Sequence, residues 1–153
     1  MAPKNGSINE DFDPEPYTQR LRKAVKGFGT DEDEIINVIG ETTPYERQRI
    51  RQYYHNSLGR YLLTDLGDDL SGDFKHLVLA LFKYSNEYYG DELHRAIYYT
   101  WGTDEDALND IVITRSNEEI ALTKRYFDYY KKYTLASELN SKKVFKGYSN
   151  NSI

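Results

Sequence analysis

The sequence has no cysteine and no long apolar run. Without thiols, neither disulfide bonds nor thiolate-ligated zinc sites can form. The longest apolar stretch, residues 77–82, is far shorter than the roughly 20 residues that cross a bilayer as a helix. The first twelve residues are polar and lack the apolar centre of a signal peptide. These absences predict a cytoplasmic protein without a membrane-spanning helix.

Basic residues are outnumbered by acidic ones, 20 against 25, and the formal net charge is −5. An acidic chain is a poor general binder of nucleic acid, and anionic lipid would repel it unless a cation lay between them. The sequence contains no recognisable catalytic triad or phosphate-binding glycine loop, and its three histidines lack the spacing of a metal site. We therefore expect neither an enzyme nor a nucleic-acid-binding protein.

Strand patterns are nearly absent, whereas helix signals recur along the chain. Gly27 and Gly59 are expected to end the first and third helices. Capping residues, prolines and apolar residues at helical spacing predict five short helices, which begin near Asp13, Thr30 or Asp31, Thr43, Leu62 and Ser71. The same succession is expected to start again at about Asp91. The predicted fold class is therefore all-α.

One loop sequence occurs twice, 73 positions apart. Residues 27–32 (GFGTDE) return as residues 100–105 (TWGTDE), and apolar residues match apolar residues downstream. A period of this size indicates an internal repeat. The copies differ, because the second loop is one residue longer and has Thr100 in place of the first glycine. Lys142 also stands where the first copy has Asp69.

The first copy has the residue types of a calcium site. Calcium takes 6–8 oxygen ligands from carbonyls, carboxylates and water. Gly27 and Gly29 can turn loop carbonyls towards one point through backbone angles that other residues avoid. Asp69, between the fourth and fifth predicted helices, could supply a carboxylate. Spacing alone leaves an alternative open, in which Gly27 merely ends a helix and Asp68 and Asp69 form a solvated acidic turn.

Together these residues resemble an annexin repeat. The resemblance rests on residues 21–32 (LRKAVKGFGTDE), 48–49 (QR), 59–63 (GRYLL), 69–72 (DLSG) and 77–81 (LVLAL). It covers about residues 15–83 and, less well, residues 91–139. It implies annexin-like five-helix repeats in a right-handed superhelix, with four helices in a bundle and the third lying across it. The chain would hold about one and a half to two such repeats.

The resemblance also implies a function. Annexins bind acidic phospholipid membranes in the presence of calcium, so Ca²⁺ is the expected cofactor and a membrane surface the expected partner. A chain of this kind would be cytoplasmic and would join membranes when calcium rises. The implied main calcium site consists of the carbonyls of Val25, Gly27 and Gly29 with the carboxylate of Asp69, and a weaker site consists of the Thr30 carbonyl and Glu32.

Phe28 and Trp101 occupy the tips of the two loops. Aromatic side chains favour the membrane interface. A loop that holds calcium beside lipid phosphate could therefore bring these rings into the headgroups. The alternative is that each ring packs against an adjacent helix.

The predicted organisation is a flexible segment over residues 1–13, a first repeat over 14–84, a degenerate second repeat over 85–143 and an irregular tail over 144–153. The tail lacks the amphipathic period of a fifth helix. The apolar face of the second repeat is therefore expected to stay partly uncovered. This leaves a second hypothesis, a helical interaction module that binds another protein or forms a homodimer through the second repeat.

Overall fold

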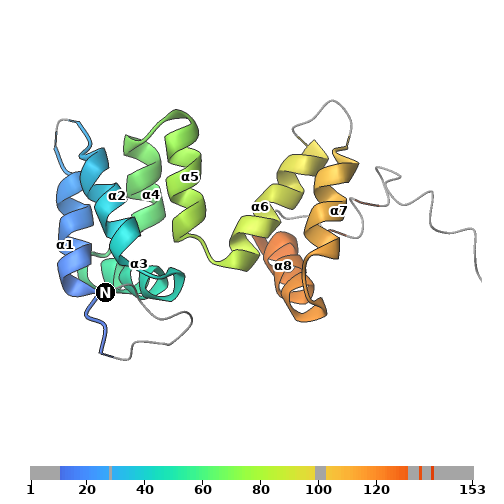
Figure 1. Cartoon of the computed structure of the whole chain (residues 1–153), viewed down its shortest axis with the longest axis horizontal. Helices are drawn as coiled ribbons and strands as arrows, with labels where there is room; N and C mark the ends of the chain where they lie inside the picture. Colours follow the sequence, from blue (N-terminus) through green and yellow to red (C-terminus); the bar gives the residue numbers. More distant parts are fainter. Residues whose placement is uncertain (1–10, 28, 99–102, 131–134, 136–138, 140–153) are drawn as a thin grey trace, which may run out of the picture. The chain divides into compact units, whose positions relative to one another are not determined.

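The computed structural model describes residues 11–27, 29–98, 103–130, 135 and 139, and the statements below concern these residues. They form eight α-helices and no strand (Figure 1), which confirms the all-α prediction. None of these helices is both long and apolar enough to cross a bilayer. The chain divides into two compact units, Met1–Lys83 and Tyr84–Ile153.

The first unit contains five helices: α1 (Glu15–Ala24), α2 (Glu32–Glu41), α3 (Pro44–Leu58), α4 (Leu62–Asp69) and α5 (Gly72–Phe82). Figure 1 shows α3 lying across the ends of the other four. Helix α1 packs against α2 and α3, α4 packs against α5, and α3 also contacts α4 and α5. This is the arrangement that the resemblance implied for one repeat.

Local signals explain several helix ends of the first unit. The carboxylate of Asp31 accepts a hydrogen bond from the Glu34 amide at 3.1 Å and caps α2. Thr43 and Glu46 form a reciprocal capping box at the start of α3. Gly59 ends that helix with a φ of 63°, in the left-handed region that glycine adopts at low cost.

Two helix ends differ from expectation. Helix α1 ends at Ala24 rather than at Gly27, because Val25 already leaves the helical conformation with φ −104° and ψ 5°. Ser71 does precede α5, but its side chain makes no capping hydrogen bond. Gly72, the first residue of α5, has a φ of 59°, so the first turn of this helix is irregular next to Ser71.

All five helices contribute to the core of the first unit. Its buried apolar residues include Leu21, Ile35, Ile50, Leu66 and Phe82. Burial of such side chains is the main stabilising contribution to a domain of this size.

A polar network crosses the core at its edge. The buried Tyr54 donates a hydrogen bond from its hydroxyl to Asp65 at 2.6 Å, and Arg60 donates to both oxygens of the same carboxylate at 2.7 and 2.6 Å. Burial and the acceptor Asp65 raise the pKa of Tyr54 to about 12. The Arg60 guanidinium holds the pKa of Asp65 below its ordinary value. The network therefore joins the end of α3 to α4.

The second unit contains α6 (Ser85–Tyr98), α7 (Glu105–Ile113) and α8 (Asn117–Tyr130). Helix α6 begins six residues before Asp91, so the predicted start of the second succession was too late. The core of the second unit consists of Leu93, Ala96, Ile97, Leu108 and Phe127, against which the half-buried Leu135 and Leu139 pack. Lys142 and the predicted tail lie outside the described residues.

Close packing of α6 on α8 depends on the buried Gly90. A Cβ at this position would lie 2.3 Å from Cδ1 of Tyr126. We expect Gly90→Ala to destabilise the second unit by about 1–2 kcal/mol, since overpacking outweighs the gain in helix propensity. Gly40→Ala in α2, where a Cβ would meet open space, is the matched control and should gain up to about 1 kcal/mol.

Chemical denaturation followed by circular dichroism measures both changes. Amide hydrogen exchange then assigns the loss to α6 and α8. Unchanged or raised stability of Gly90→Ala would show that the ring of Tyr126 moves aside without cost.

Candidate functional site

The candidate site lies in the loop that joins α1 to α2. After Ala24, Gly27 and Gly29 adopt φ values of 130° and 90°, conformations that L side chains rarely adopt. A Cβ on either glycine would meet no atom within 4 Å. The requirement for glycine is therefore one of backbone conformation and not of crowding. The loop closes where the Asp31 amide donates to the Ala24 carbonyl at 3.0 Å.

The end of α4 lies next to this loop. The Thr30 hydroxyl donates a hydrogen bond to the backbone carbonyl of Asp69 at 3.3 Å. Asp69 is the last residue of α4, and its side chain is exposed. Two segments 39 residues apart in the sequence thus meet at one place, which the sequence alone predicted only through the family resemblance.

The oxygens of the loop are available for a ligand. Among the described residues, no hydrogen bond ends on the carbonyls of Val25, Gly27 or Gly29. The Asp69 carboxylate likewise forms no ion pair with a described residue, since Arg60 and Arg22 bind Asp65 instead. Hard carbonyl and carboxylate oxygens are the donors that calcium takes. The residues therefore fit a calcium ion in their chemistry.

Carboxylate clusters do not form an alternative metal centre. The described part of the chain holds no group of three or more histidine, aspartate or glutamate side chains that could hold an ion. The proposed calcium ligands are mostly backbone carbonyls, and only Asp69 and Glu32 contribute side chains to them. Glu32 is exposed in the first turn of α2, beside Thr30.

The second loop keeps only part of these features. Its closing hydrogen bond is present, from the Asp104 amide to the Ala96 carbonyl at 3.0 Å, and Asp104 caps α7 through the Ala107 amide. Residues 99–102 and Lys142 lie outside the described residues, as do the predicted membrane-contact residues Phe28 and Trp101.

Two features of the first unit were not predicted from the sequence. One is the network around Asp65, and the other is a groove between α1 and α3 that Thr18 lines. Both depend on contacts between helices far apart in the chain. The buried threonine at the third α1 position before Leu21 was the only local hint, because a polar residue stands there in the apolar stripe.

Comparison with known proteins bears on the whole chain. The sequence model of the family described as Annexin matches residues 17–81 and 87–150. Annexin A4 of Sus scrofa is 37% identical over 147 residues, which cover 95% of this chain and 46% of that protein. Among solved structures, annexin III superimposes with a TM-score of 0.81 at 31% identity, over 89% of this chain and 42% of that one.

A second structure adds a metal. Calcium-bound annexin (Sm)1 superimposes with a TM-score of 0.76 at 26% identity, over 89% of this chain and 41% of that chain. The present chain therefore spans less than half the length of these relatives.

Proposed function

Because this chain belongs to the annexin family, we propose that it binds acidic phospholipid membranes in a calcium-dependent manner, through the loop of residues 25–30 and Asp69. Annexins typically bind phospholipid membranes with calcium and are not enzymes. The observation that carries the proposal is the hydrogen bond from the Thr30 hydroxyl to the Asp69 carbonyl, since it brings the residue that bears the carboxylate next to the glycine loop.

Each residue has a definite role in this proposal. Val25, Gly27 and Gly29 offer neutral carbonyl oxygens, while Asp69 offers the negative charge that a divalent ion needs. Calcium, when bound, supplies the positive charge that links protein oxygens to lipid phosphates. A weaker second site would use the Thr30 carbonyl and Glu32. No basic patch is then needed on a chain whose net charge is −5.

The aromatic residues at the loop tips complete this proposal. Phe28 and Trp101 would enter the headgroup region, where aromatic side chains are favoured. The second loop lacks the first glycine and has Lys142 at the acidic position, so its part would be limited to Trp101 and a weak site at most.

Vesicle sedimentation tests the proposal directly. The chain should sediment with phosphatidylserine-containing vesicles in calcium and stay in the supernatant in chelator. It should not sediment with neutral phosphatidylcholine vesicles in either condition. Equal sedimentation in calcium and in chelator would contradict a calcium bridge. Because one good site gives little avidity, binding should be weaker than that of a relative with several such sites.

A second candidate function is self-association through the second unit. Val112, Ile113 and Leu122 on α7 and α8 are 44%, 79% and 45% exposed. In the first unit Val38 is fully buried, whereas Ile111, its counterpart 73 positions later, is only half-buried. Exposed apolar surface of this kind favours an interface, most simply a two-fold dimer.

Light scattering at micromolar concentration measures this association. We expect a dimer for the parent chain and a monomer for Ile113→Lys, because a lysine cannot be buried unpaired in an apolar contact. Ile36→Lys in the first unit, where the parent isoleucine is 51% exposed, is the matched control and should leave the dimer intact. A parent chain that stays monomeric would exclude this second function.

A further inference from the structure

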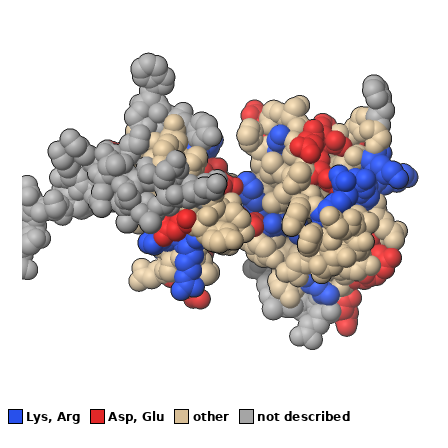
Figure 2. Space-filling model, turned by 180° about the vertical axis from the view of Figure 1, so that it is seen from behind, with Lys and Arg blue, Asp and Glu red and all other residues tan. Residues whose placement is uncertain are grey.

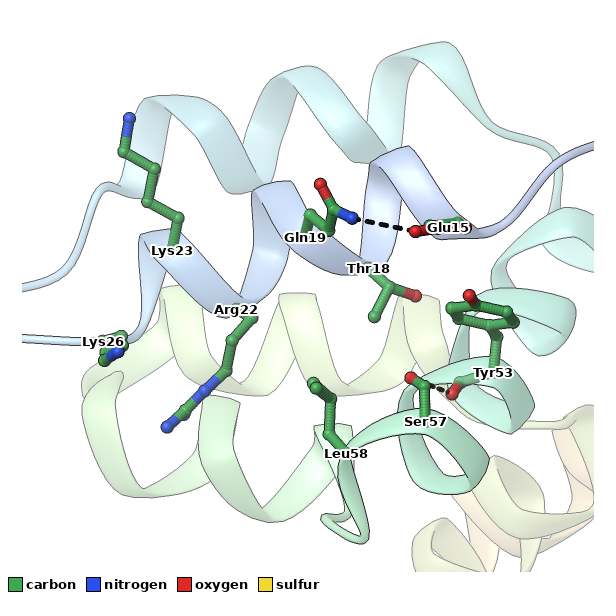
Figure 3. A pocket seen from close by; sticks show the side chains of 9 residues that line it. All are labelled: Glu15, Thr18, Gln19, Arg22, Lys23, Lys26, Tyr53, Ser57 and Leu58. Atoms are coloured by element: carbon green, nitrogen blue, oxygen red, sulfur yellow. Dashed lines mark hydrogen bonds between the residues drawn. The ribbon is translucent and has the colours of Figure 1, made fainter.

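A groove of about 450 Å³ lies between α1 and α3 of the first unit (Figure 3). Figure 3 shows Tyr53 at one end of this groove and Arg22 and Lys26 towards the other, with Leu58 between them. All the lining residues belong to the first unit; they are Glu15, Thr18, Gln19, Arg22 and Lys23 from α1, Lys26 from the loop that follows it, and Tyr53, Ser57 and Leu58 from α3.

An unsatisfied hydroxyl lies at the base of this groove. Thr18 is 2% exposed, and its Oγ1 is a buried side-chain atom without a hydrogen-bond partner. Figure 3 shows the side chain projecting from α1 towards α3. Leaving a buried hydroxyl without a partner is unfavourable, and buried polar groups are nearly always paired. A ligand that reached Thr18 would supply the missing partner.

The second unit shows what fits this place. Thr18 and Tyr53 correspond to Gly90 and Tyr126, since α6 follows α1 by 72 positions and α8 follows α3 by 73. Tyr126 packs its ring directly on Gly90, where a Cβ would lie 2.3 Å from Cδ1. Thr18 has a Cβ, so Tyr53 cannot pack as closely on α1. Because Thr18 stands where the second unit has Gly90, the first unit leaves space at the place that the Tyr126 ring fills in the second unit.

Two further groove positions have aromatic counterparts in the second unit. Ser57 corresponds to Tyr130, whose ring lies 4.7 Å from that of Tyr126. Lys26 corresponds to Tyr98, whose ring lies 4.6 Å from that of His94. The second unit thus carries rings at sequence positions whose counterparts line the groove in the first unit.

The charge of the groove is positive. Arg22, Lys23 and Lys26 line it, of which Arg22 also pairs with Asp65 at 3.4 Å. The single acid that lines it is Glu15, which accepts a hydrogen bond from Gln19 at 3.0 Å. Lys26 is exposed and forms no ion pair with a described residue. Figure 2 shows Lys and Arg side chains gathered at the outer edge of the first unit, on the right of that view. An anionic ligand is therefore favoured over a neutral or cationic one.

From these observations we infer that the groove between α1 and α3 binds a small aromatic anion. The ring lies over Thr18 between Tyr53 and Leu58, a hydroxyl on the ring pairs with Thr18 Oγ1, and the anionic group faces Arg22 and Lys26. This site shares only the side chain of Lys26 with the loop of residues 25–30, and none of its contacts uses the loop carbonyls or Asp69.

4-Hydroxyphenylacetate is a suitable probe, since it combines the ring and hydroxyl of a tyrosine side chain with a carboxylate. Titration of the ¹⁵N-labelled full chain in chelator, without vesicles, should shift amide signals of α1 and α3 in a saturable way. A ligand of about ten heavy atoms should bind with a dissociation constant of roughly 1 mM. Tyramine, which carries a positive charge instead, should bind more weakly.

Two variants test the position of the ligand. Ser57→Tyr introduces the ring that the second unit has at this place and should abolish the shifts in α1 and α3. Thr18→Val removes the hydroxyl at equal size and should weaken 4-hydroxyphenylacetate about fivefold, as for one net hydrogen bond, while leaving phenylacetate unchanged. Thr64→Val, at an exposed position in α4, is the matched control and should change neither ligand.

Failure of this inference can be told from failure of the proposed function. Three results would contradict binding in the groove. They are the absence of saturable shifts, shifts confined to the second unit, and an equal loss of affinity for both ligands in Thr18→Val. None of these results involves calcium or lipid. If Ser57→Tyr lost its helical circular dichroism spectrum, the comparison of the two ligands in Thr18→Val would still decide.

Discussion

Asp69→Asn is expected to remove most calcium-dependent sedimentation with acidic vesicles while leaving the fold unchanged. Asparagine supplies only a neutral oxygen, and calcium affinity depends strongly on the number of charged ligands. Asp69 is exposed and forms no ion pair with a described residue, so its loss should cost little stability. We expect the apparent calcium affinity to fall at least about tenfold, which corresponds to about 1.4 kcal/mol.

Two further variants sharpen this test. Asp69→Lys should abolish binding completely, because an ammonium group at the site repels calcium. Asp68→Asn makes the same change of charge at the neighbouring exposed position and should sediment like the parent. Isothermal titration with calcium and vesicle sedimentation give the two readouts. Parent-like binding by Asp69→Asn would mean that Asp69 is not a ligand.

Asp65→Asn should destabilise the first unit by about 2 kcal/mol and lower its melting temperature by roughly 10 °C. The Asp65 carboxylate accepts hydrogen bonds from Tyr54 and from two nitrogens of Arg60, and it is 6% exposed. An amide would direct its own N–H groups at one of these donors. The expected loss is moderate because Arg60 itself is half exposed.

The same residue predicts a dependence on pH. Because folding lowers the pKa of Asp65, its contribution is fully present above the ordinary aspartate pKa of about 4 and is lost as pH falls through the folded value. The melting temperature of the parent should therefore fall below about pH 4. The melting temperature of the Asp65→Asn variant should fall less steeply over this range. Parallel curves would show that Asp65 does not govern acid sensitivity, and Asp68→Asn serves as the control.

Helix ends with a local cause were the most predictable part of the fold. Helix α3 was predicted to start at Thr43 and to end at Gly59, and both ends are confirmed, because each depends on residues within one or two turns. The end of α1 was placed too late at Gly27, because Gly27 and Gly29 provide positive φ angles in the loop after the helix and do not end the helix itself. The start of α6 was placed too late because its first six residues, 85–90 (SNEYYG), hold only two adjacent tyrosines among polar or small residues and show no apolar helical period.

The candidate site was predicted in part. Spacing alone could not bring Asp69 to the loop, since α2, α3 and most of α4 lie between the two segments. The resemblance supplied that contact, and the Thr30 hydrogen bond to Asp69 agrees with it. The groove at Thr18 could not be predicted, because it arises from the distance between α1 and α3 and from which side chains fail to fill it.

The contact between Thr30 and Asp69 also has a consequence for folding thermodynamics. Its two partners lie on either side of α2, α3 and most of α4, so the oxygens converge only when the first unit has folded. An ion bound there has no comparable affinity for the unfolded chain, and its binding free energy adds to the stability of the first unit alone. Each tenfold excess of calcium over the dissociation constant then adds about 1.4 kcal/mol. If calcium binds at the proposed site, a rise in calcium should therefore increase the free energy of unfolding of the first unit and leave that of the second unchanged.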